Sequence, residues 1–244
     1  MNKYPGKYGK ETYKQLEEVC RFGYNFSQVF SDFVETVLSA LLSFTDNLRY
    51  ADVADRIREN RLTGVYEDRY MSLIARYKEN KDRAQGSRPA DFFTHAWAQL
   101  QLETAQTQQD VLGEIYEACM GRPEHGQFFT PPQITDLLAG MIDAKDGETV
   151  SDPACGAGRF FIAQSKIHSG LHYVGVDIAP VIARMCVLNM WLFDLYADIY
   201  EGNSLSGQMF YLWRVRPGGY IDETKIDQAS REKPEVRKEV AEAA

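Results

Sequence analysis

Two glycines and two aspartates have the types and spacing of a nucleoside-binding site. An apolar segment leads into Asp152, a Gly-x-Gly turn follows at Gly156 and Gly158, and a helical pattern begins directly after it. In a strand–glycine turn–helix unit, a nucleotide-like ligand can lie close against the backbone. Glycine suits the turn because a Cβ atom would hold the ligand away and would disfavour positive φ angles.

Asp177 supplies the second half of this pattern. It ends the next apolar segment, 19 residues after Gly158, and a carboxylate that binds ribose hydroxyls is expected about 20 residues after such a turn. The pattern therefore predicts an adenosine-containing ligand, with an ordinary βα turn and a surface aspartate as the alternative. A third glycine and a Gly-Lys-Ser/Thr sequence are both absent, which disfavours ligands bound through a pyrophosphate.

Three segments resemble a known family. Residues 152–158, Asp-Pro-Ala-Cys-Gly-Ala-Gly, resemble motif I of S-adenosylmethionine-dependent DNA adenine-N6 methyltransferases. Residues 126–132, Gly-Gln-Phe-Phe-Thr-Pro-Pro, resemble the segment before this motif in the modification subunits of type I restriction systems. Residues 110–117, with Asp-x-Leu-Gly-x-x-Tyr-Glu, resemble the helix that leads into it. The three motifs occur in the order of the family, which makes the resemblance more specific than any one of them.

The resemblance implies a fold, a cofactor and a set of site residues. The fold is α/β, a shortened class I (Rossmann-like) methyltransferase core with a helical N-terminal region. The cofactor is S-adenosylmethionine (SAM), the acceptor is DNA, and a specificity-type or other subunit is an expected partner. The residues that the resemblance assigns to SAM are Phe129, Thr130, Asp152, Ala154, Gly156, Gly158, Asp177, Ile178 and Asn203.

Several of these residues have a specific expected role. By resemblance, Thr130 reaches the methionine end of SAM, with Phe128 and Phe129 as walls, although a threonine before Pro-Pro equally suits a helix N-cap. Asp152, at the end of its strand, would face the methionine ammonium. Ile178 either lies against the adenine ring or is core.

Asn203 marks a departure from the family. The family has an acidic residue after a glycine here, which binds the adenine amine, whereas this chain has Gly202-Asn203. An asparagine still offers an acceptor oxygen, but the negative charge is lost and we expect weaker cofactor affinity.

The sequence departs from the family most clearly in its catalytic motif. Adenine-N6 methyltransferases carry an Asn/Asp-Pro-Pro-aromatic tetrapeptide that holds the flipped base and accepts hydrogens from its exocyclic amine. The only Pro-Pro here is Pro131-Pro132, preceded by Thr130. We therefore predict no catalytic residue, and weak or absent methylation by this chain alone, because positioning of the nucleophile supplies much of such a rate acceleration.

Three functions remain open from the sequence. The first is a DNA adenine-N6 methyltransferase that works with SAM and partner subunits. The second is a non-catalytic SAM-binding accessory or scaffold protein derived from a type I modification subunit. The third is a small-molecule or protein methyltransferase, whose acceptor site Tyr211 and Trp213 would have to line, although a core strand suits these residues better.

Composition narrows the class of protein. The net charge is −8, and residues 121–204 contain five basic and ten acidic side chains, so no basic footprint for strong independent nucleic-acid binding is visible. Four separated cysteines without a Cys-x-x-Cys predict reduced thiols, no metal site and a cytoplasmic location. No apolar stretch approaches the roughly 20 residues that a membrane span needs, and no secretory signal is expected.

The expected elements follow from hydrophobic periodicity and divide the chain into three parts. Residues 1–120 form a helical region. Its clearest helix follows Asn25 or Ser27 and carries an apolar stripe from Val29 to Leu42, with Asp32, Glu35 and Ser39 on the opposite, polar side. Further helices are expected at 11–21, 51–60, 65–80 and 90–120, the last with an optional break at 99–109.

Residues 121–221 form the SAM-binding domain. Strands are expected at 148–152 and 172–177, residues 199–205 are a third strand or its end, and helices are expected at 133–141, 159–168 and 181–196. Residues 216–219, Arg-Pro-Gly-Gly, predict a turn. Residues 222–244 are charged and lack aromatic residues, which predicts a frayed helix or a disordered tail.

Overall fold

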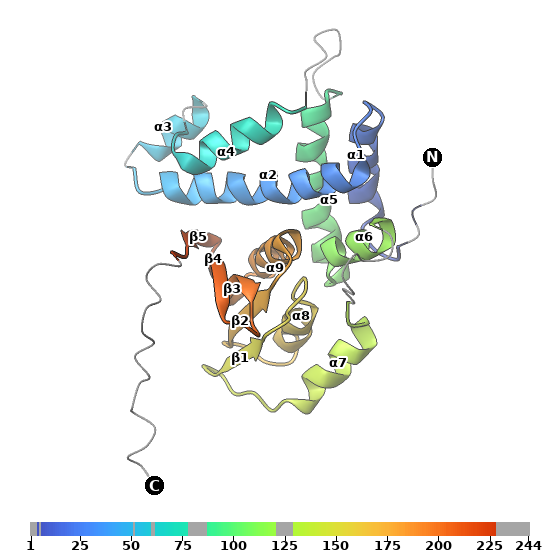
Figure 1. The fold of residues 1–244 in the computed structure, drawn as a ribbon, viewed down its shortest axis with the longest axis vertical. Helices are drawn as coiled ribbons and strands as arrows, with labels where there is room; N and C mark the ends of the chain where they lie inside the picture. Colours follow the sequence, from blue (N-terminus) through green and yellow to red (C-terminus); the bar gives the residue numbers. More distant parts are fainter. Residues whose placement is uncertain are drawn as a thin grey trace.

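The computed structural model describes residues 4, 6–50, 52–59, 62–77, 87–120 and 129–227. A layer of helices lies over one α/β core, as Figure 1 shows. The helical layer consists of α1 (Lys10–Cys20), α2 (Phe26–Asn47), α3 (Val53–Arg58), α4 (Val65–Ile74), α5 (Pro89–Thr107) and α6 (Val111–Cys119). The core contains α7 (Pro132–Met141), β1 (Thr149–Asp152), α8 (Arg159–Ser165), β2 (His172–Asp177), α9 (Pro180–Leu192), β3 (Tyr196–Asn203), β4 (Gln208–Arg216) and β5 (Tyr220–Lys225).

The sheet has the order β1-β2-β3-β4-β5. Its first three strands are parallel and are connected by α8 and α9, whereas β4 and β5 are antiparallel additions beyond β3. Parallel strands joined by helices are the units of a doubly wound α/β fold, so the predicted α/β, Rossmann-like core is confirmed. The turn predicted at residues 216–219 joins β4 to β5.

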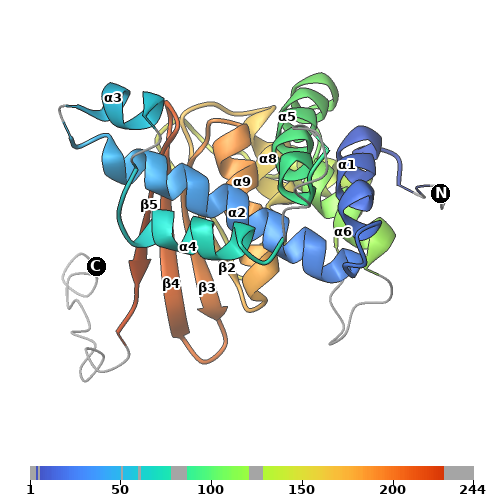
Figure 2. The ribbon, with the colours of Figure 1, turned by 90° about the horizontal axis from the view of Figure 1, so that it is seen from above.

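Helix α2 connects the helical layer to the core. Asn25 caps it, with its side-chain oxygen accepting a hydrogen bond of 2.9 Å from the Ser27 amide. The helix lies across α9 and β5, as Figure 2 shows from above, and Val29, Phe30 and Phe33 are fully buried. The predicted apolar stripe is therefore confirmed. The division of the chain at residue 120 stays a prediction.

The polar side of α2 is covered as well, which its sequence pattern does not indicate. Asp32 and Ser39 are buried because α4 and the residues after it cover this side of the helix. Arg76 and Tyr77 each donate a hydrogen bond of 2.9 Å to the Asp32 carboxylate, and Arg69 donates one of 2.9 Å to the Ser39 hydroxyl. Both sides of α2 are therefore packed, and polar partners satisfy the Asp32 carboxylate and the Ser39 hydroxyl.

The optional break in the 90–120 helix is present. Helix α5 ends at Thr107, Gln108 adopts a left-handed conformation with φ 53°, and Asp110 begins α6 as its N-cap. The Asp110 carboxylate accepts a hydrogen bond of 2.7 Å from the Gly113 amide, which is the usual bond of an N-cap aspartate. The break turns the chain so that α6 faces the core rather than continuing away from it.

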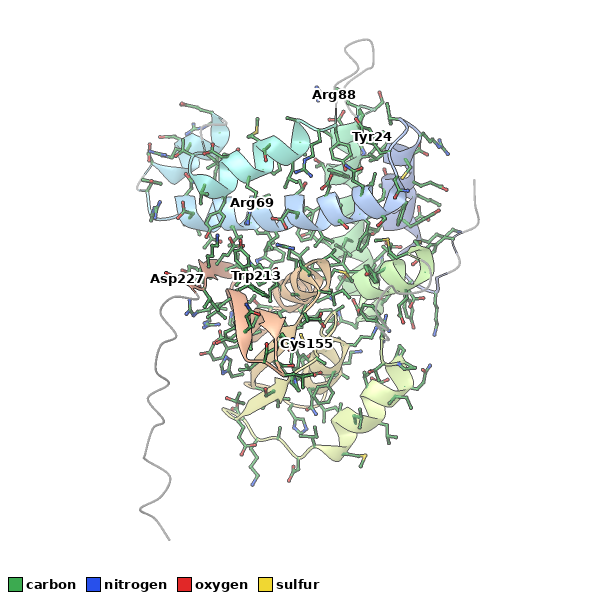
Figure 3. All side chains as sticks on the ribbon, in the orientation of Figure 1. Tyr24, Arg69, Arg88, Cys155, Trp213 and Asp227 are labelled. Carbon is green, nitrogen blue, oxygen red and sulfur yellow. The ribbon has the colours of Figure 1, made fainter. Side chains whose placement is uncertain are left out.

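Two predicted elements are corrected. Tyr196, expected as the last residue of a helix, and residues 197–198, expected between the helix and the strand, begin strand β3, because α9 ends at Leu192 and Ala197 is fully buried in the sheet. Residues 222–225, expected in a frayed tail, belong to β5. Ile221 is buried there. The Glu223 carboxylate accepts a hydrogen bond of 2.7 Å from the Trp213 indole and forms an ion pair of 3.2 Å with Arg69. Figure 3 labels Arg69 and Trp213 at this contact between layer and sheet.

Helix α7 presents an apolar face to solvent. Its small residues Thr135 and Ala139 are buried, and the Ala139 carbonyl accepts a hydrogen bond of 3.1 Å from Gln164 of α8. A stripe of large apolar residues, between 43% and 73% exposed, lies elsewhere on the helix: Ile134, Leu137, Leu138 and Met141. Among the described strands, β1 pairs only with β2. The β1 side of the sheet thus has an unpaired edge, and the same half of the core has an exposed apolar helix face.

No helix within the described residues combines the length and the apolar character that crossing a bilayer would require.

Candidate functional site

The glycine turn lies at the carboxyl ends of the parallel strands, where ligands of α/β sheets bind. Asp152, the last residue of β1, is opposite Gly175 in the register, so β2 extends two residues further to Asp177. The turn folds over this extension, with the Cys155 amide donating a hydrogen bond of 3.0 Å to the Val176 carbonyl. The Cys155 label in Figure 3 marks this turn.

Asp177 holds the turn through its carboxylate. One carboxylate oxygen accepts a hydrogen bond of 3.1 Å from the Gly156 amide, and the other accepts one of 2.9 Å from the Ala179 amide. A carboxylate has about four acceptor positions, so about two remain for hydroxyl donors. Two adjacent ribose hydroxyls match this number.

The Asp177 carboxyl is partly buried and lies near the charge of Asp152. Burial raises the pKa of the Asp177 carboxyl and the nearby charge of Asp152 raises it further, while the two amide hydrogen bonds oppose the shift. Within the described part of the chain, neither aspartate forms an ion pair. A cationic ligand with hydroxyl donors would relieve the repulsion between the two carboxylates. SAM is a ligand of this kind, because it carries a sulfonium, an ammonium and ribose hydroxyls.

The two glycines have different surroundings. Gly156 has φ 55°, and among the described residues a Cβ atom there would meet only the Phe129 ring, at 3.7 Å. Gly158 has φ 84°, and a Cβ atom there would approach Met190 Cε to 2.8 Å and Cys186 Sγ to 2.9 Å. Gly156 therefore leaves space on the side of the turn that Phe129 faces, whereas Gly158 allows close packing of the turn on α9.

Phe129 and Thr130 lie against the turn. Phe129 is half-buried, and its ring centroid is 5.7 Å from that of Tyr116 on α6. Thr130 is exposed. The alternative role of Thr130 as a helix N-cap is wrong, because α7 begins at Pro132 and its N-cap position is Pro131, with no side-chain cap. Phe128 lies outside the described residues.

The remaining predicted residues lie at the same end of the sheet. The Ala154 amide donates a hydrogen bond of 2.9 Å to Asp152, which shapes the start of the turn. Ile178 is 61% exposed, so its alternative role in the core is wrong. Asn203 ends β3, and its side-chain oxygen accepts hydrogen bonds from the Leu205 and Ser206 amides at 3.0 and 3.2 Å. That oxygen is thus engaged in its own turn, which leaves it less available to an adenine amine.

Sequence reasoning missed Arg159, which is the first residue of α8. Its guanidinium contacts Asp110 at 3.0 Å and Glu117 at 2.6 Å, and donates a bond of 3.4 Å to the Thr130 carbonyl. A signal was present in the sequence: a cation at a helix N-terminus is disfavoured by the helix dipole. An arginine directly after the glycine turn therefore has to be held by acidic groups from elsewhere in the chain.

Asp110 and Asn189 complete this set of contacts. Asn189 Nδ2 donates to Asp110 at 2.7 Å and to the Ala157 carbonyl at 2.8 Å. Burial raises the pKa of Asp110, against the opposing effects of the Arg159 charge and the Gly113 and Asn189 hydrogen bonds. The motif at residues 110–117 thus reaches the glycine turn physically, through α6.

Other possible sites of the described chain do not coincide with this one. Three cavities lie in or beside the helical layer, the largest of about 500 Å³ between α2, α4 and β5, and no predicted site residue lines any of the three. Within the residues that the structure covers, no group of three or more His, Cys, Asp or Glu side chains is arranged to hold a metal ion. Trp213 is fully buried in β4, so its alternative use as an acceptor site is wrong.

Comparison with known proteins identifies relatives of this chain. Residues 107–227 match the family model described as N-6 DNA Methylase. The chain is 25% identical over 179 residues to the type I restriction enzyme MjaVIII methylase subunit of Methanocaldococcus jannaschii, covering 68% of this chain and 30% of the relative. It is 34% identical over 122 residues to the EcoEI methylase subunit of Escherichia coli, covering 42% of this chain and 25% of the relative.

Among solved structures, the methyltransferase subunit of a type I restriction-modification system from Streptococcus thermophilus aligns with a TM-score of 0.40 and 13% identity. The alignment covers 78% of this chain and 57% of that one. The alignment with the MjaVIII methylase subunit covers about 30% of the length of that relative. The segment that matches the family model, residues 107–227, begins just before α6 and ends just after β5. It therefore contains the glycine turn, Asp177 and the residues that hold them. Residues 107–227 are thus similar to the adenine-N6 DNA methyltransferases, and the chain resembles the modification subunits of type I restriction systems.

Proposed function

We propose that this chain binds SAM at the glycine turn and acts in the methylation of adenine N6 in DNA. The observation that carries the proposal is the Asp177 carboxylate, which joins the Gly156 amide to the end of β2 and keeps about two acceptor positions for ribose hydroxyls. The space beside Gly156, where Phe129 is the only described residue within 4 Å of a Cβ position, supports close approach of the ligand to the backbone.

Each residue has a defined role in this proposal. Asp177 accepts hydrogen bonds from the ribose hydroxyls, and Asp152 balances the ammonium of the methionine moiety. Phe129 and Thr130 border the methionine end, and Ile178, Ala154 and Asn203 border the nucleoside. SAM, when bound, supplies a methyl group on a sulfonium. The carboxylates orient that group in a pocket where two negative charges favour a cationic ligand over its neutral product.

We propose that the acceptor side of the pocket comes from a partner polypeptide. The sequence of 244 residues contains no Asn/Asp-Pro-Pro-aromatic tetrapeptide. The unpaired edge of β1 and the exposed apolar stripe of α7 support this proposal, because apolar faces of this kind mark protein contacts, and a strand edge can pair with another strand. A group added beside β1 would lie next to Asp152, at the carboxyl end of the sheet.

DNA, a specificity-type subunit and a cytoplasmic location are part of the same proposal. The type I methylase relatives support DNA as the substrate. The net charge of −8 supports help from a partner in DNA binding, since phosphate contacts need basic side chains.

Labelled-methyl transfer tests this function. The chain is incubated with methyl-labelled SAM and unmethylated DNA, alone and with candidate subunits encoded beside it, and N6-methyladenine is quantified by mass spectrometry. We expect N6-methyladenine only in the presence of a partner. The new bond joins the methyl carbon to N6, the carbon–sulfur bond breaks, N6 loses a proton, and S-adenosylhomocysteine is released.

Two other results would change the conclusion. Robust transfer by the isolated chain would contradict the need for a partner. SAM binding without transfer in any combination would favour the second function, a non-catalytic SAM-binding accessory or scaffold protein.

A further inference from the structure

Arg159 occupies a position that its own helix disfavours. It is the first residue of α8, where the helix dipole opposes a positive charge, and its side chain is only 10% exposed. Burial lowers the pKa of its guanidinium, but the charges of Asp110 and Glu117 outweigh this effect, and the net shift is upward. The side chain therefore stays charged, and its position is fixed by partners outside α8.

The contacts of Arg159 come from two segments that flank the proposed pocket. Asp110 and Glu117 belong to the start and end of α6, and they hold the guanidinium at 3.0 and 2.6 Å. Thr130 accepts a hydrogen bond of 3.4 Å through its carbonyl, and the guanidinium carbon lies 5.3 Å from the centre of the Phe129 ring. One side chain thus connects α6 to the segment at residues 129–130.

Asp110, a partner of Arg159, is also connected to the glycine turn through Asn189. Asp110 also accepts a hydrogen bond of 2.7 Å from Asn189, which in turn donates one of 2.8 Å to the Ala157 carbonyl inside the turn. Of the residues that the structure describes, Phe129 is the nearest to the open side of Gly156. The turn and the Phe129–Thr130 wall are therefore tied together, with Arg159 as the group that they share.

We propose that Arg159 is a positioning residue for SAM. It acts through Phe129 and Thr130, which it draws against the glycine turn so that the methionine end of the ligand has a wall. Arg159 does not reach Asp177, which holds the ribose from β2. This inference rests on the proposed SAM-binding function, and it assigns to this chain a residue that neither the sequence motifs nor their order identified.

Arginine is required for this role because of its shape. Its planar fork contacts two carboxylates and a carbonyl while its face covers an aromatic ring, whereas lysine offers a single point charge. We therefore expect Arg159→Lys to keep an ion pair with Asp110 but to lose the contacts with Phe129 and Thr130. Arg159→Gln removes the charge as well.

Arg184 provides a matched control. It too is a largely buried arginine that joins a carboxylate of the helical layer to one of the core, since it pairs with Glu35 at 2.7 Å and Glu201 at 3.4 Å. None of its ion-pair partners belongs to the glycine turn or to residues 129–130. Arg184→Gln should therefore cost stability without affecting the ligand.

The test compares two ligands by calorimetry, S-adenosylhomocysteine and adenosine. Arg159→Gln and Arg159→Lys should each weaken S-adenosylhomocysteine at least tenfold and change adenosine affinity less than threefold. Arg184→Gln should change neither, even where its melting temperature falls as far as that of the Arg159 variants. If Arg159→Gln does not fold, Arg159→Lys, which keeps the charge, gives the comparison.

The outcomes separate this inference from the function on which it rests. Wild-type affinity for S-adenosylhomocysteine in both Arg159 variants would overturn it, and so would an equal loss of both ligands, which would indicate general damage to the site. If the wild-type chain binds neither ligand, the SAM-binding function fails. The positioning itself is then judged from hydrogen exchange, where the Phe129 and Thr130 amides should exchange faster in Arg159→Lys than in Arg184→Gln, and equal rates would overturn it.

Discussion

Alanine substitution at Gly156 and at Gly158 separates ligand space from core packing. Both glycines have positive φ, so alanine costs each about 1–2 kcal/mol of folding free energy. At Gly158 the new methyl group would also meet Met190 and Cys186 at 2.8 and 2.9 Å, and such overpacking adds about 1–3 kcal/mol. Gly147 is the control, because it has φ 83° and open space around its Cβ position.

The expected result is a crossover between stability and binding. Unfolding is followed by circular dichroism, and one kcal/mol corresponds to about 2–4 °C in a chain of this size. We expect Gly158→Ala to lower the melting temperature by about 10 °C, and Gly156→Ala and Gly147→Ala each by about 4 °C. Only Gly156→Ala should combine this small loss with a drop of tenfold or more in SAM affinity, because its methyl group enters the space beside Phe129.

This reasoning is refuted if Gly156→Ala binds SAM as tightly as Gly147→Ala, since Gly156 would then border no ligand. It is also refuted if Gly158→Ala is no less stable than Gly147→Ala, since the packing of the turn on α9 would then contribute nothing to the free energy of folding.

Three further predictions concern the acidic groups and the contact between the layers. Because burial raises the pKa of Asp177, SAM affinity should be complete above that pKa and fall as the pH drops through it. Asp177→Asn should flatten this profile in calorimetric titrations, and an unchanged profile would exclude Asp177 as its source. Asp110→Ala leaves Arg159 largely buried without a main partner, and urea denaturation should show a loss of about 3–5 kcal/mol; a loss below 1 kcal/mol would contradict the buried ion pair. Trp213→Phe removes the hydrogen bond to Glu223 and should cost about 1.5–3 kcal/mol in the same assay, with no change in SAM affinity, whereas an equal loss of affinity would show that β4 contributes to the site.

The sequence predicted the core better than the helical layer, for a physical reason. Strand β2 was predicted at its observed bounds, and β1 within one residue, because a short apolar segment followed by a glycine turn is a local signal. The burial of Asp32 and Ser39 could not be predicted because it depends on α4 and the residues after it, more than 20 residues further along the chain. An apolar stripe identifies the strongest buried face of a helix, but it does not show whether the other face is also covered.

The strand ends show a similar limit. Residues 196–198 contain no glycine or proline that separates helix from strand, and only pairing with β2 and β4 defines the start of β3. Residues 222–225 are charged, yet they pair with β4 because Trp213 and Arg69 provide partners for Glu223. Charge indicates solvent exposure only when no buried partner exists elsewhere in the fold.

For the candidate site, the motifs located the residues but not the contacts between them. Gly156, Gly158, Asp152 and Asp177 follow from spacing, and the structure brings them together at one end of the sheet. Arg159 and Asn189 were missed because their partners are 29 to 79 residues away in the chain. Contacts of this kind depend on the packing of α6 against α9, which no local pattern encodes.

The central claim is that Asp177 and the glycine turn together bind SAM. Calorimetric titration of the wild-type chain and of Asp177→Ala with SAM tests it most directly. We predict saturable binding by the wild type and a loss of tenfold or more in Asp177→Ala, which corresponds to about 1.4 kcal/mol, the scale of a charge-assisted hydrogen bond. No binding by the wild-type chain, or equal affinity in the two proteins, would contradict the account.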